Sequence, residues 1–421
     1  MTAIRADDPS IELHPRCVAP RQDAPTVPAA PRAPISAAVA RRLMRRAVAA
    51  LPIRVQFPDG TSAGAGDRDD PLMVIHRPRD FFARLGADAK IGFGEAYMAG
   101  DWDAGPNTDL ADLLTPFASN LANLVPKSLK GFRRVIERRQ PLSEQATRSQ
   151  ARQNIHRHYD LSNDLFAAFL DETLTYSSAL FEAGDDFAAA QRRKTTAILD
   201  LADVRPGCSM LEIGTGWGEL AIQAARRGAQ VTSLTLSTEQ RDLALQRVAA
   251  AGVSDRVQIL LADYREVTGQ FDAIVSVEMI EAVGLRYWPE FFAILDRSLR
   301  PGGRIGLQTI TMDHDRMWAT RNSYTWIHKY IFPGGIIPSI RAIETGLRDN
   351  TSLSITGRRD FGQDYARTMN CWRATFLANW PMIAVNRFDP VFRRLWEFYL
   401  AYCEAGFRAG HLGVSQLSIT R

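Results

Sequence analysis

Residues 210–218 read MLEIGTGWG, and this stretch decides the fold. Its first four residues predict a short apolar strand, and a helical run follows at 219–227. The glycines between them, Gly214, Gly216 and Gly218, let backbone N–H groups approach a ligand that any Cβ atom would hold off. Strand, glycine turn and helix in this order predict the first unit of a nucleotide-binding α/β sheet.

The spacing of these glycines discriminates between nucleotide ligands. A dinucleotide fingerprint, G-x-G-x-x-G, needs its third glycine at position 219, where this chain has Glu219. The G-x-G-x-G turn therefore argues against NAD or FAD and favours S-adenosylmethionine. Glycines in an ordinary strand-to-helix turn are the alternative that this segment alone leaves open.

Helices and strands alternate after residue 190, which predicts a doubly wound, parallel α/β sheet. The expected strands are 209–213, 230–236, 257–262, 271–277 and 304–310, and the expected helices are 191–202, 219–227, 239–251 and 287–299. Ligands of such sheets bind at the carboxyl ends of the strands. The residues at or just beyond those ends are Gly214, Ser237, Asp263, Glu281 and Thr311.

Length and composition predict more than one domain. The chain has 421 residues, 46% of them apolar, which exceeds one ordinary core. We expect a disordered tail over 1–34, a small α+β domain over 35–125, a basic linker over 126–154 and the main α/β domain over 155–421. No window approaches the roughly 20 apolar residues of a membrane span, and no signal-peptide core is present. Four scattered cysteines without a C-x-x-C pair indicate a reduced, cytoplasmic protein with no zinc site.

Positive charge gathers in two segments, although the net charge is only +4. The first is a predicted amphipathic helix over 35–51, which carries Arg41, Arg42, Arg45 and Arg46 and could lie on an anionic bilayer. A domain-packing helix with a solvated basic face is the alternative. The second is the linker, whose charge favours binding to phosphate-rich surfaces. A solvated linker without such a partner is the alternative. Nucleic acid is not expected as a partner, because no aromatic or glycine-rich RNA signature accompanies the charge.

Several further strings occur together and in a fixed order. They are 158–166 (HYDLSNDLF), 175–178 (TYSS), 234–240 (LTLSTEQ), 263–265 (DYR), 275–281 (VSVEMIE) and 329–335 (KYIFPGG). In this combination the chain resembles the cyclopropane-fatty-acid synthase family of S-adenosylmethionine-dependent lipid methyltransferases, over about residues 155–421. The resemblance implies a seven-stranded, Rossmann-like methyltransferase sheet. It is greatest to the actinobacterial branch that makes the 10-methylene precursor of 10-methyl (tuberculostearic) acids.

The resemblance also implies a cofactor site. Residues at the methionine end of S-adenosylmethionine would be Tyr176 and Ser177, and Thr235 and Gln240 would reach the ribose. Asp263 and Tyr264 would contact the adenine, because the carboxylate of Asp263 can accept a hydrogen bond from the adenine amine. The strand and turn beneath the cofactor would contribute Glu212, Gly214, Thr215, Gly216, Trp217 and Gly218. A helix N-cap is the alternative role for Asp263, and a solvated helix face for Gln240.

The family's chemistry needs a base, which the resemblance identifies as a bound bicarbonate held by a Cys, a Glu, a His and a Tyr. The matching positions here are Glu281, Tyr365, Ser178 in place of the Cys, and Gln308 in place of the His. A structural salt bridge is the alternative for Glu281, and ordinary core packing for Tyr365. Cys403 matches a cysteine that the family has been thought to use catalytically, but a buried core cysteine is the interpretation that the chemistry favours.

A cis alkene that attacks the sulfonium methyl leaves a carbocation, which requires a dry, apolar pocket. An aromatic-rich stretch could supply its walls or be plain core: Trp318, Tyr324, Trp326, Tyr330, Ile331 and Phe332. We therefore expect methylation of unsaturated phospholipid acyl chains at the inner membrane surface, with a methylene-branched product. A cyclopropane product, a soluble small-molecule acceptor and a non-catalytic lipid-binding protein are the alternatives. The expected partners are an acyl chain and an anionic membrane surface, and the resemblance allows a homodimer and a separate reductase.

Overall fold

The computed structural model describes residues 26–120, 163–385 and 388–421. The expected tail therefore lies mostly outside the described residues, as does the basic linker over 126–154. Within the described part, residues 26–33 precede the first helix, and the guanidinium of Arg84 donates a hydrogen bond to the carbonyl of Pro28.

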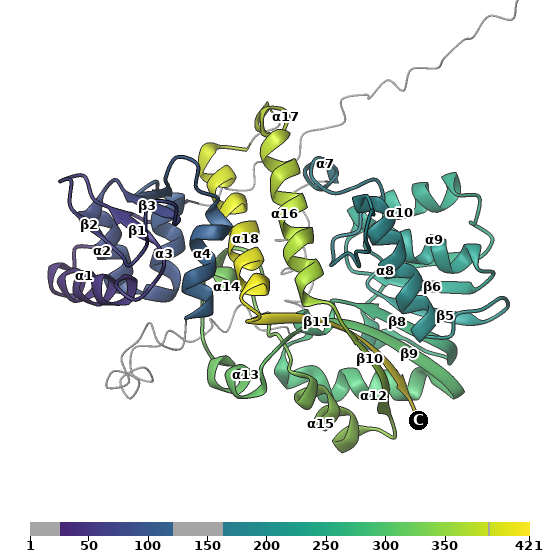
Figure 1. Cartoon of the computed structure of the whole chain (residues 1–421). Coiled ribbons are helices and arrows are strands. Elements are labelled where there is room, and N and C mark those ends of the chain that lie inside the picture. The colour runs from purple at the N-terminus through teal and green to yellow at the C-terminus, as the bar shows by residue number, and fades with distance from the viewer. Residues whose placement is uncertain (1–25, 121–162, 386–387) are drawn as a thin grey trace, which may run out of the picture.

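A seven-stranded sheet forms the larger part of the molecule (Figure 1), in the order β10-β11-β9-β8-β5-β6-β7. Its strands are β5 (Ser209–Ile213), β6 (Gln230–Thr235), β7 (Val257–Leu261), β8 (Phe271–Val277), β9 (Leu299–Met312), β10 (Ser354–Asp360) and β11 (Leu412–Thr420). Strands β7, β6, β5, β8 and β9 run parallel, whereas β11 is antiparallel to both β9 and β10. The predicted doubly wound α/β sheet is thereby confirmed, with five parallel strands where the sequence placed them.

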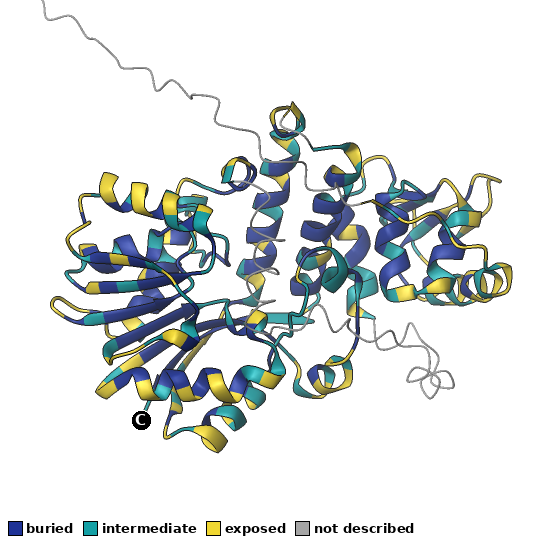
Figure 2. Ribbon diagram, turned by 180° about the vertical axis from the view of Figure 1, so that it is seen from behind, coloured by how far each residue is buried: buried dark blue, intermediate teal, exposed yellow. Residues whose placement is uncertain are grey.

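Helices cover both faces of this sheet. One face packs against α8 (Phe187–Leu201), α9 (Glu219–Arg226) and α10 (Thr238–Ala250) through residues such as Met210 and Val275. The other face packs against α12 (Trp288–Ser298) and α15 (Ile340–Asn350) through Leu211 and Ile274. Neighbouring strand residues thus point to opposite cores, so the central strands are apolar on both sides. Figure 2 shows these strands buried mainly in their middle, with more exposed residues toward their ends.

Several short helices complete this part of the molecule. They are α7 (Asn163–Ala167), η3 (Tyr264–Glu266), α11 (Ile280–Val283), η4 (Leu285–Tyr287), α13 (His314–Thr320), α14 (Trp326–Tyr330) and α17 (Trp380–Val385). The segment Pro301-Gly302-Gly303 lies within the first part of β9.

The N-terminal part forms a second, smaller unit with a four-stranded sheet in the order β2-β1-β3-β4. Its elements are α1 (Pro34–Val48), β1 (Arg54–Gln56), β2 (Ser62–Ala63), β3 (Leu72–Ile75), α2 (Pro78–Ala87), α3 (Ala89–Met98), β4 (Trp102–Ala104) and α4 (Leu110–Ser119). Two long helices inserted between β10 and β11, α16 (Gly362–Ala378) and α18 (Pro390–Arg408), lie between this unit and the large sheet (Figure 1).

Charged contacts fix the small unit to these helices. Arg373 of α16 donates to Asp109, which caps α4, and to Glu404 of α18. Arg394 of α18 donates to the carbonyls of Tyr97 and Trp102. The two units consequently share one apolar core, in which residues of α3, α4, α16 and α18 pack together.

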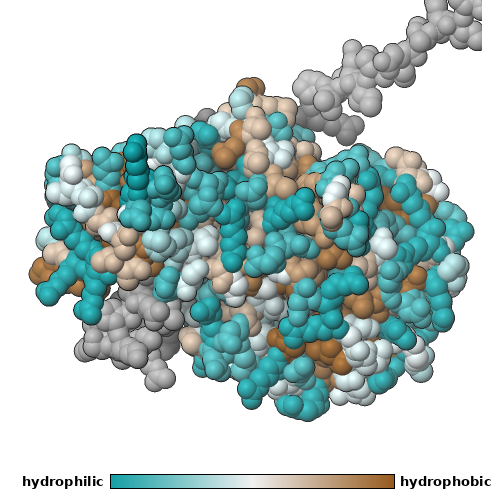
Figure 3. All heavy atoms as spheres, in the orientation of Figure 1, coloured by the Kyte–Doolittle hydropathy of each residue, from teal (hydrophilic) through white to brown (hydrophobic). Residues whose placement is uncertain are grey.

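The surface seen in Figure 3 is mostly hydrophilic, with hydrophobic side chains in small separate patches. Across the described residues, no helix combines the length and the apolar character that a membrane crossing requires.

Candidate active site

The glycine turn after β5 has the backbone geometry that only glycine adopts without strain. Gly214, Gly216 and Gly218 have φ of 101°, 52° and 90°, and Gly218 caps the start of α9. A Cβ atom on Gly214 would lie 2.7 Å from the Met279 side chain, whereas one on Gly216 would meet no protein atom within 4 Å. Gly216 therefore opens onto empty space, as a turn that cradles a ligand must.

That space belongs to a cavity of about 1780 Å³. The volume exceeds the 300–1,000 Å³ that is usual for a small-molecule site, so the cavity can hold a nucleotide and a second, long ligand. It begins at the glycine turn and reaches α1 of the small unit. Its apolar wall between these two ends includes Leu43, Met44, Phe93, Trp326, Ile331, Phe332 and Phe398.

Polar residues at the ends of β5 and β6 form a connected network beside the turn. The hydroxyls of Thr215 and Ser233 are 2.7 Å apart, and Ser233 Oγ donates to Glu212 Oε2 at 2.5 Å. Burial raises the pKa of Glu212 to about 8. Nearby, Thr235 Oγ1 donates to Gln240 Oε1 at 3.0 Å, and both residues line the cavity. The structure thus brings together the residues expected at the ribose.

Residues expected at the methionine end line the same cavity. Tyr176 OH lies 2.8 Å from Tyr399 OH, and Ser177 Oγ accepts from Lys194 Nζ at 2.8 Å. Burial lowers the pKa of Lys194 to about 8. The sequence did not point to Lys194, because nothing in a helical run distinguishes a lysine that faces inward. Trp217 lines the same cavity and donates through Nε1 to Asn163 Oδ1 at 2.8 Å.

Asp263 has the helix-capping role that the sequence left open. Its carboxylate accepts from the backbone N–H of Arg265 and pairs with the Arg265 guanidinium at 2.6 and 2.7 Å. A capping box with Glu266 completes the start of η3. Tyr264, the next residue, lines the cavity.

Three of the residues expected around an anion converge instead on Glu278, the residue after β8. Its Oε1 accepts from the backbone N–H of Ser178 at 3.1 Å and from Gln308 Nε2 at 2.8 Å. Its Oε2 accepts from Tyr365 OH at 2.7 Å. The Ser178 hydroxyl donates elsewhere, to the carbonyl of Ala179. The sequence reasoning missed Glu278; the available signal was a second carboxylate at the end of an apolar strand, three residues before Glu281.

Glu281 lies on α11 at the cavity wall but has different partners. Its Oε1 accepts from Thr309 Oγ1 at 2.8 Å and from the backbone N–H of Ile310 at 2.5 Å. Its Oε2 has no hydrogen-bond partner among the described protein atoms. Burial and the negative charge of Glu278 raise the pKa of Glu281 to about 8, so its carboxyl group is mainly neutral at pH 7.

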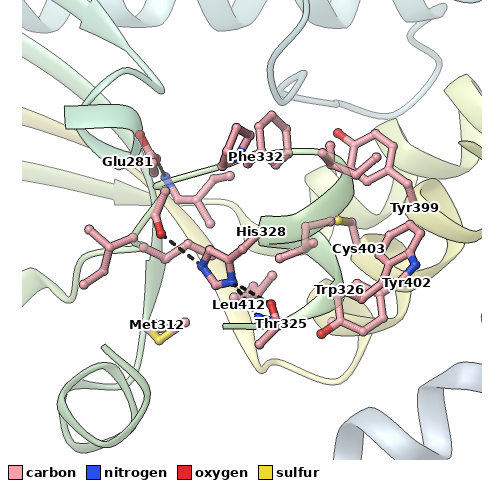
Figure 4. A pocket seen from close by; sticks show the side chains of 18 of the residues that line it. Glu281, Met312, Thr325, Trp326, His328, Phe332, Tyr399, Tyr402, Cys403 and Leu412 are labelled. Carbon is pink, nitrogen blue, oxygen red and sulfur yellow. Dashed lines mark hydrogen bonds between the residues drawn. The ribbon is translucent and has the colours of Figure 1, made fainter. Parts of the chain in front are cut away.

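Figure 4 shows Glu281 at one side of the pocket and Cys403, Tyr399 and Tyr402 at the other, with Phe332 between them. Burial raises the pKa of the Cys403 thiol to about 12, so the thiolate is not available at neutral pH. Of the aromatic-rich stretch, Tyr324, Trp326, Ile331 and Phe332 line the cavity. Tyr330 instead donates to Glu95, and Trp318 is 42% exposed.

Within the described ranges, no group of three or more His, Cys, Asp or Glu residues is arranged to hold a metal ion.

Known proteins match this chain over most of its length. A model of the family described as mycolic acid cyclopropane synthetase matches residues 146–417. The tuberculostearic acid methyltransferase UfaA1 of Mycobacterium tuberculosis is 51% identical over 403 residues, which are 94% of each chain. The cyclopropane-fatty-acyl-phospholipid synthase of Escherichia coli (strain K12) is 35% identical over 83% of this chain and 88% of that protein.

A solved structure is similar as well. The mycolic acid cyclopropane synthase CmaA1, complexed with SAH and CTAB, matches with a TM-score of 0.60 and 31% identity, over 64% of this chain and 98% of that one. The chain therefore belongs to the mycolic acid cyclopropane synthetase family and is an S-adenosylmethionine-dependent methyltransferase.

Proposed function

We propose that this enzyme methylates the cis double bond of unsaturated phospholipid acyl chains and produces a methylene-branched chain. One observation carries the proposal: a single cavity of about 1780 Å³ runs from the cofactor turn to α1, between apolar walls. A small soluble acceptor would not need such a length of apolar wall. The 51% identity to a tuberculostearic acid methyltransferase supports the branched product.

When bound, S-adenosylmethionine supplies an electrophilic methyl group. Gly216 leaves the room for it, and the Thr235–Gln240 pair offers oxygen acceptors to the ribose hydroxyls. The apolar walls exclude water, which would otherwise trap the carbocation that methyl transfer leaves on the acyl chain. Trp326 and Phe332 also line the cavity, and aromatic rings stabilise a nearby cation.

The product can be tested with an oleoyl phospholipid that carries deuterium at both alkene carbons. A hydride shift before proton loss moves one deuterium to the neighbouring carbon and gives a terminal =CH2, which mass spectrometry detects. We expect this outcome. A cyclopropane with both deuterium atoms unmoved would support the alternative, the activity named for the Escherichia coli relative. The methylene group would be the substrate of a separate reductase.

We further propose that α1 docks the enzyme on an anionic membrane surface. Ile35 and Val39 of α1 line the cavity and are 82% and 53% exposed, so the cavity opens beside an uncovered apolar face. The same helix carries exposed arginines at positions 41, 42, 45 and 46. An amphipathic helix of this kind binds anionic bilayers through both its apolar and its basic side chains.

Changing Arg41 and Arg42 to serine should weaken binding to anionic vesicles about 30-fold. Each Lys or Arg near such a surface contributes about 1 kcal/mol, and two correspond to roughly this factor. Vesicle sedimentation at low and high salt measures it, and wild-type binding should fall as salt rises. The matched control changes the exposed Arg341 and Arg348 of α15 to serine, which removes equal charge away from the cavity mouth. Equal losses in both double variants would contradict docking through α1.

A further inference from the structure

Glu278 accepts hydrogen bonds from three of the four residues that the family resemblance assigns to a bound bicarbonate. Its two oxygens accept from three donors: the Ser178 N–H, Gln308 Nε2 and Tyr365 OH. These donors come from three separate segments, and all three residues are buried. An exogenous anion would have to compete with a carboxylate that is covalently held at the same donors.

We propose that the Glu278 side chain is itself the base that removes the proton in this enzyme, in place of a bound bicarbonate. The proposal rests on the proposed function, since it concerns the proton that the methylated acyl chain must lose. Glu278 lines the cavity, on the same wall as Gly214 and Met279, so its carboxylate can reach a ligand bound there.

The backbone at Glu278 has a strained conformation. Its φ is 53°, in the left-handed region that favours glycine, and its N–H donates to the carbonyl of Gln308 at 2.8 Å. The hydrogen bond continues the β8–β9 pairing by one residue, so the turn occurs at Glu278 itself. Strain of this kind persists where the surrounding structure imposes it, often at a functional site.

The charges around Glu278 suit a single ionised carboxylate. Lys194 is the cation whose charge acts on Glu278, and it is 2% exposed. Glu281 on α11 is mainly neutral at pH 7, and the pKa of Tyr365 on α16 is raised, so its hydroxyl keeps the proton that it donates. Burial away from water raises the pKa of Glu278 itself, whereas the hydrogen bonds from Gln308 and Tyr365 act to lower it. A base with a raised pKa accepts a proton more readily than an ordinary carboxylate.

The step balances without any further reactant. The alkene's π electrons form a bond to the methyl group, the C–S bond breaks with its pair left on sulfur, and one alkene carbon becomes cationic. A 1,2-hydride shift moves the positive charge to the carbon that bears the new methyl group. A methyl C–H bond then breaks, its electron pair forms the C=CH2 branch on the chain, and the proton bonds to a Glu278 carboxylate oxygen. The neutral Glu278 loses this proton to water before the next turnover.

The test compares variants with wild type by transfer of labelled methyl from S-adenosylmethionine to unsaturated phospholipid vesicles, in buffer stripped of carbon dioxide. Glu278→Gln should lower kcat by about 10²–10⁴-fold, the range typical for loss of a general base. Calorimetry should show unchanged cofactor binding. Wild type should keep its activity, within about twofold, when bicarbonate is restored to the stripped buffer.

Glu278→Gly provides a second measurement that does not depend on the glutamine variant. Glycine suits the φ of 53°, and its missing side chain leaves Gln308 and Tyr365 free to hold a small carboxylate. Formate or bicarbonate should therefore restore at least tenfold activity to this variant. The matched control is Glu278→Gln, in which the amide fills the site and the same anions should restore nothing.

Three results would overturn the role of Glu278: a glutamine variant as active as wild type, a glycine variant that no anion restores, or a wild type that loses activity without bicarbonate. A wild type that labels no lipid would reject the proposed function, and the role of Glu278 with it. An active wild type that Glu278→Gln leaves unaffected would reject only the role of Glu278.

Discussion

Changing Gly216 to valine is expected to abolish S-adenosylmethionine binding. Gly216 has a φ of 52°, and the space beside its Cα holds no protein atom within 4 Å. A branched side chain would project into the space that the cofactor needs, and a β-branched residue is strained at this φ. The first effect opposes cofactor binding, and the second lowers the stability of the folded protein.

Calorimetry with S-adenosylmethionine measures this loss, and Gly252→Val separates its two causes. Gly252 follows α10 and has a φ of 68°, and a Cβ atom on it would likewise meet no protein atom within 4 Å, but it lies outside the cavity lining. The Gly252→Val variant should lose stability because of the same backbone strain, but it should bind the cofactor normally. Normal binding by Gly216→Val would show that the turn is not the cofactor site.

The glycine turn could be predicted from sequence because its determinants are local. An apolar strand, three glycines and a helix lie within 18 residues, and the structure forms β5 and α9 at nearly the predicted bounds. The same holds for β8, where Ala273 and Val275 pack in one core and Ile274 between them packs in the other. Each of these elements follows from periodicity and turn chemistry alone.

The anion-holding residues could not be assigned from sequence, because their partners depend on register. Gln308 and Thr309 are neighbours on β9, yet Gln308 donates to Glu278 and Thr309 to Glu281. The two glutamates are only three residues apart, and either could match a single catalytic position. The hydrogen bonds from Gln308 and Tyr365 join Glu278, at the end of β8, to β9 and α16, so its partners depend on long-range packing.

The packing of the small unit against α16 and α18 could not be predicted from the sequence either. Arg373, Asp109 and Glu404 come from three distant segments, and nothing in their local patterns links them. The apolar faces of α3 and α4 predict that something covers them, but only the structure shows that α18 does so.

Changing Glu281 to glutamine is expected to stabilise the protein increasingly as pH rises from about 5 to about 8. The pKa of Glu281 is raised from 4.5 to about 8 by burial and by the charge of Glu278. Between these two values the unfolded chain releases the Glu281 proton while the folded protein keeps it. The folded state therefore loses stability as pH rises through this window, and the loss is complete only above the folded-state pKa.

Glutamine removes this dependence, because its amide stays neutral while its oxygen can still accept from Thr309 and Ile310. Each pKa unit corresponds to about 1.4 kcal/mol, so the variant should gain a few kcal/mol relative to wild type across the window. Thermal unfolding at pH 5 to 8 measures the difference in Tm between variant and wild type. Burial also raises the pKa of Glu212, but this residue is present in both proteins, so its contribution cancels in the difference. The control, Glu344→Gln on the exposed face of α15, should shift Tm equally at every pH. A Tm difference for Glu281→Gln that is just as constant would mean that Glu281 is ionised at neutral pH, and that the wall beside Glu278 carries two negative charges.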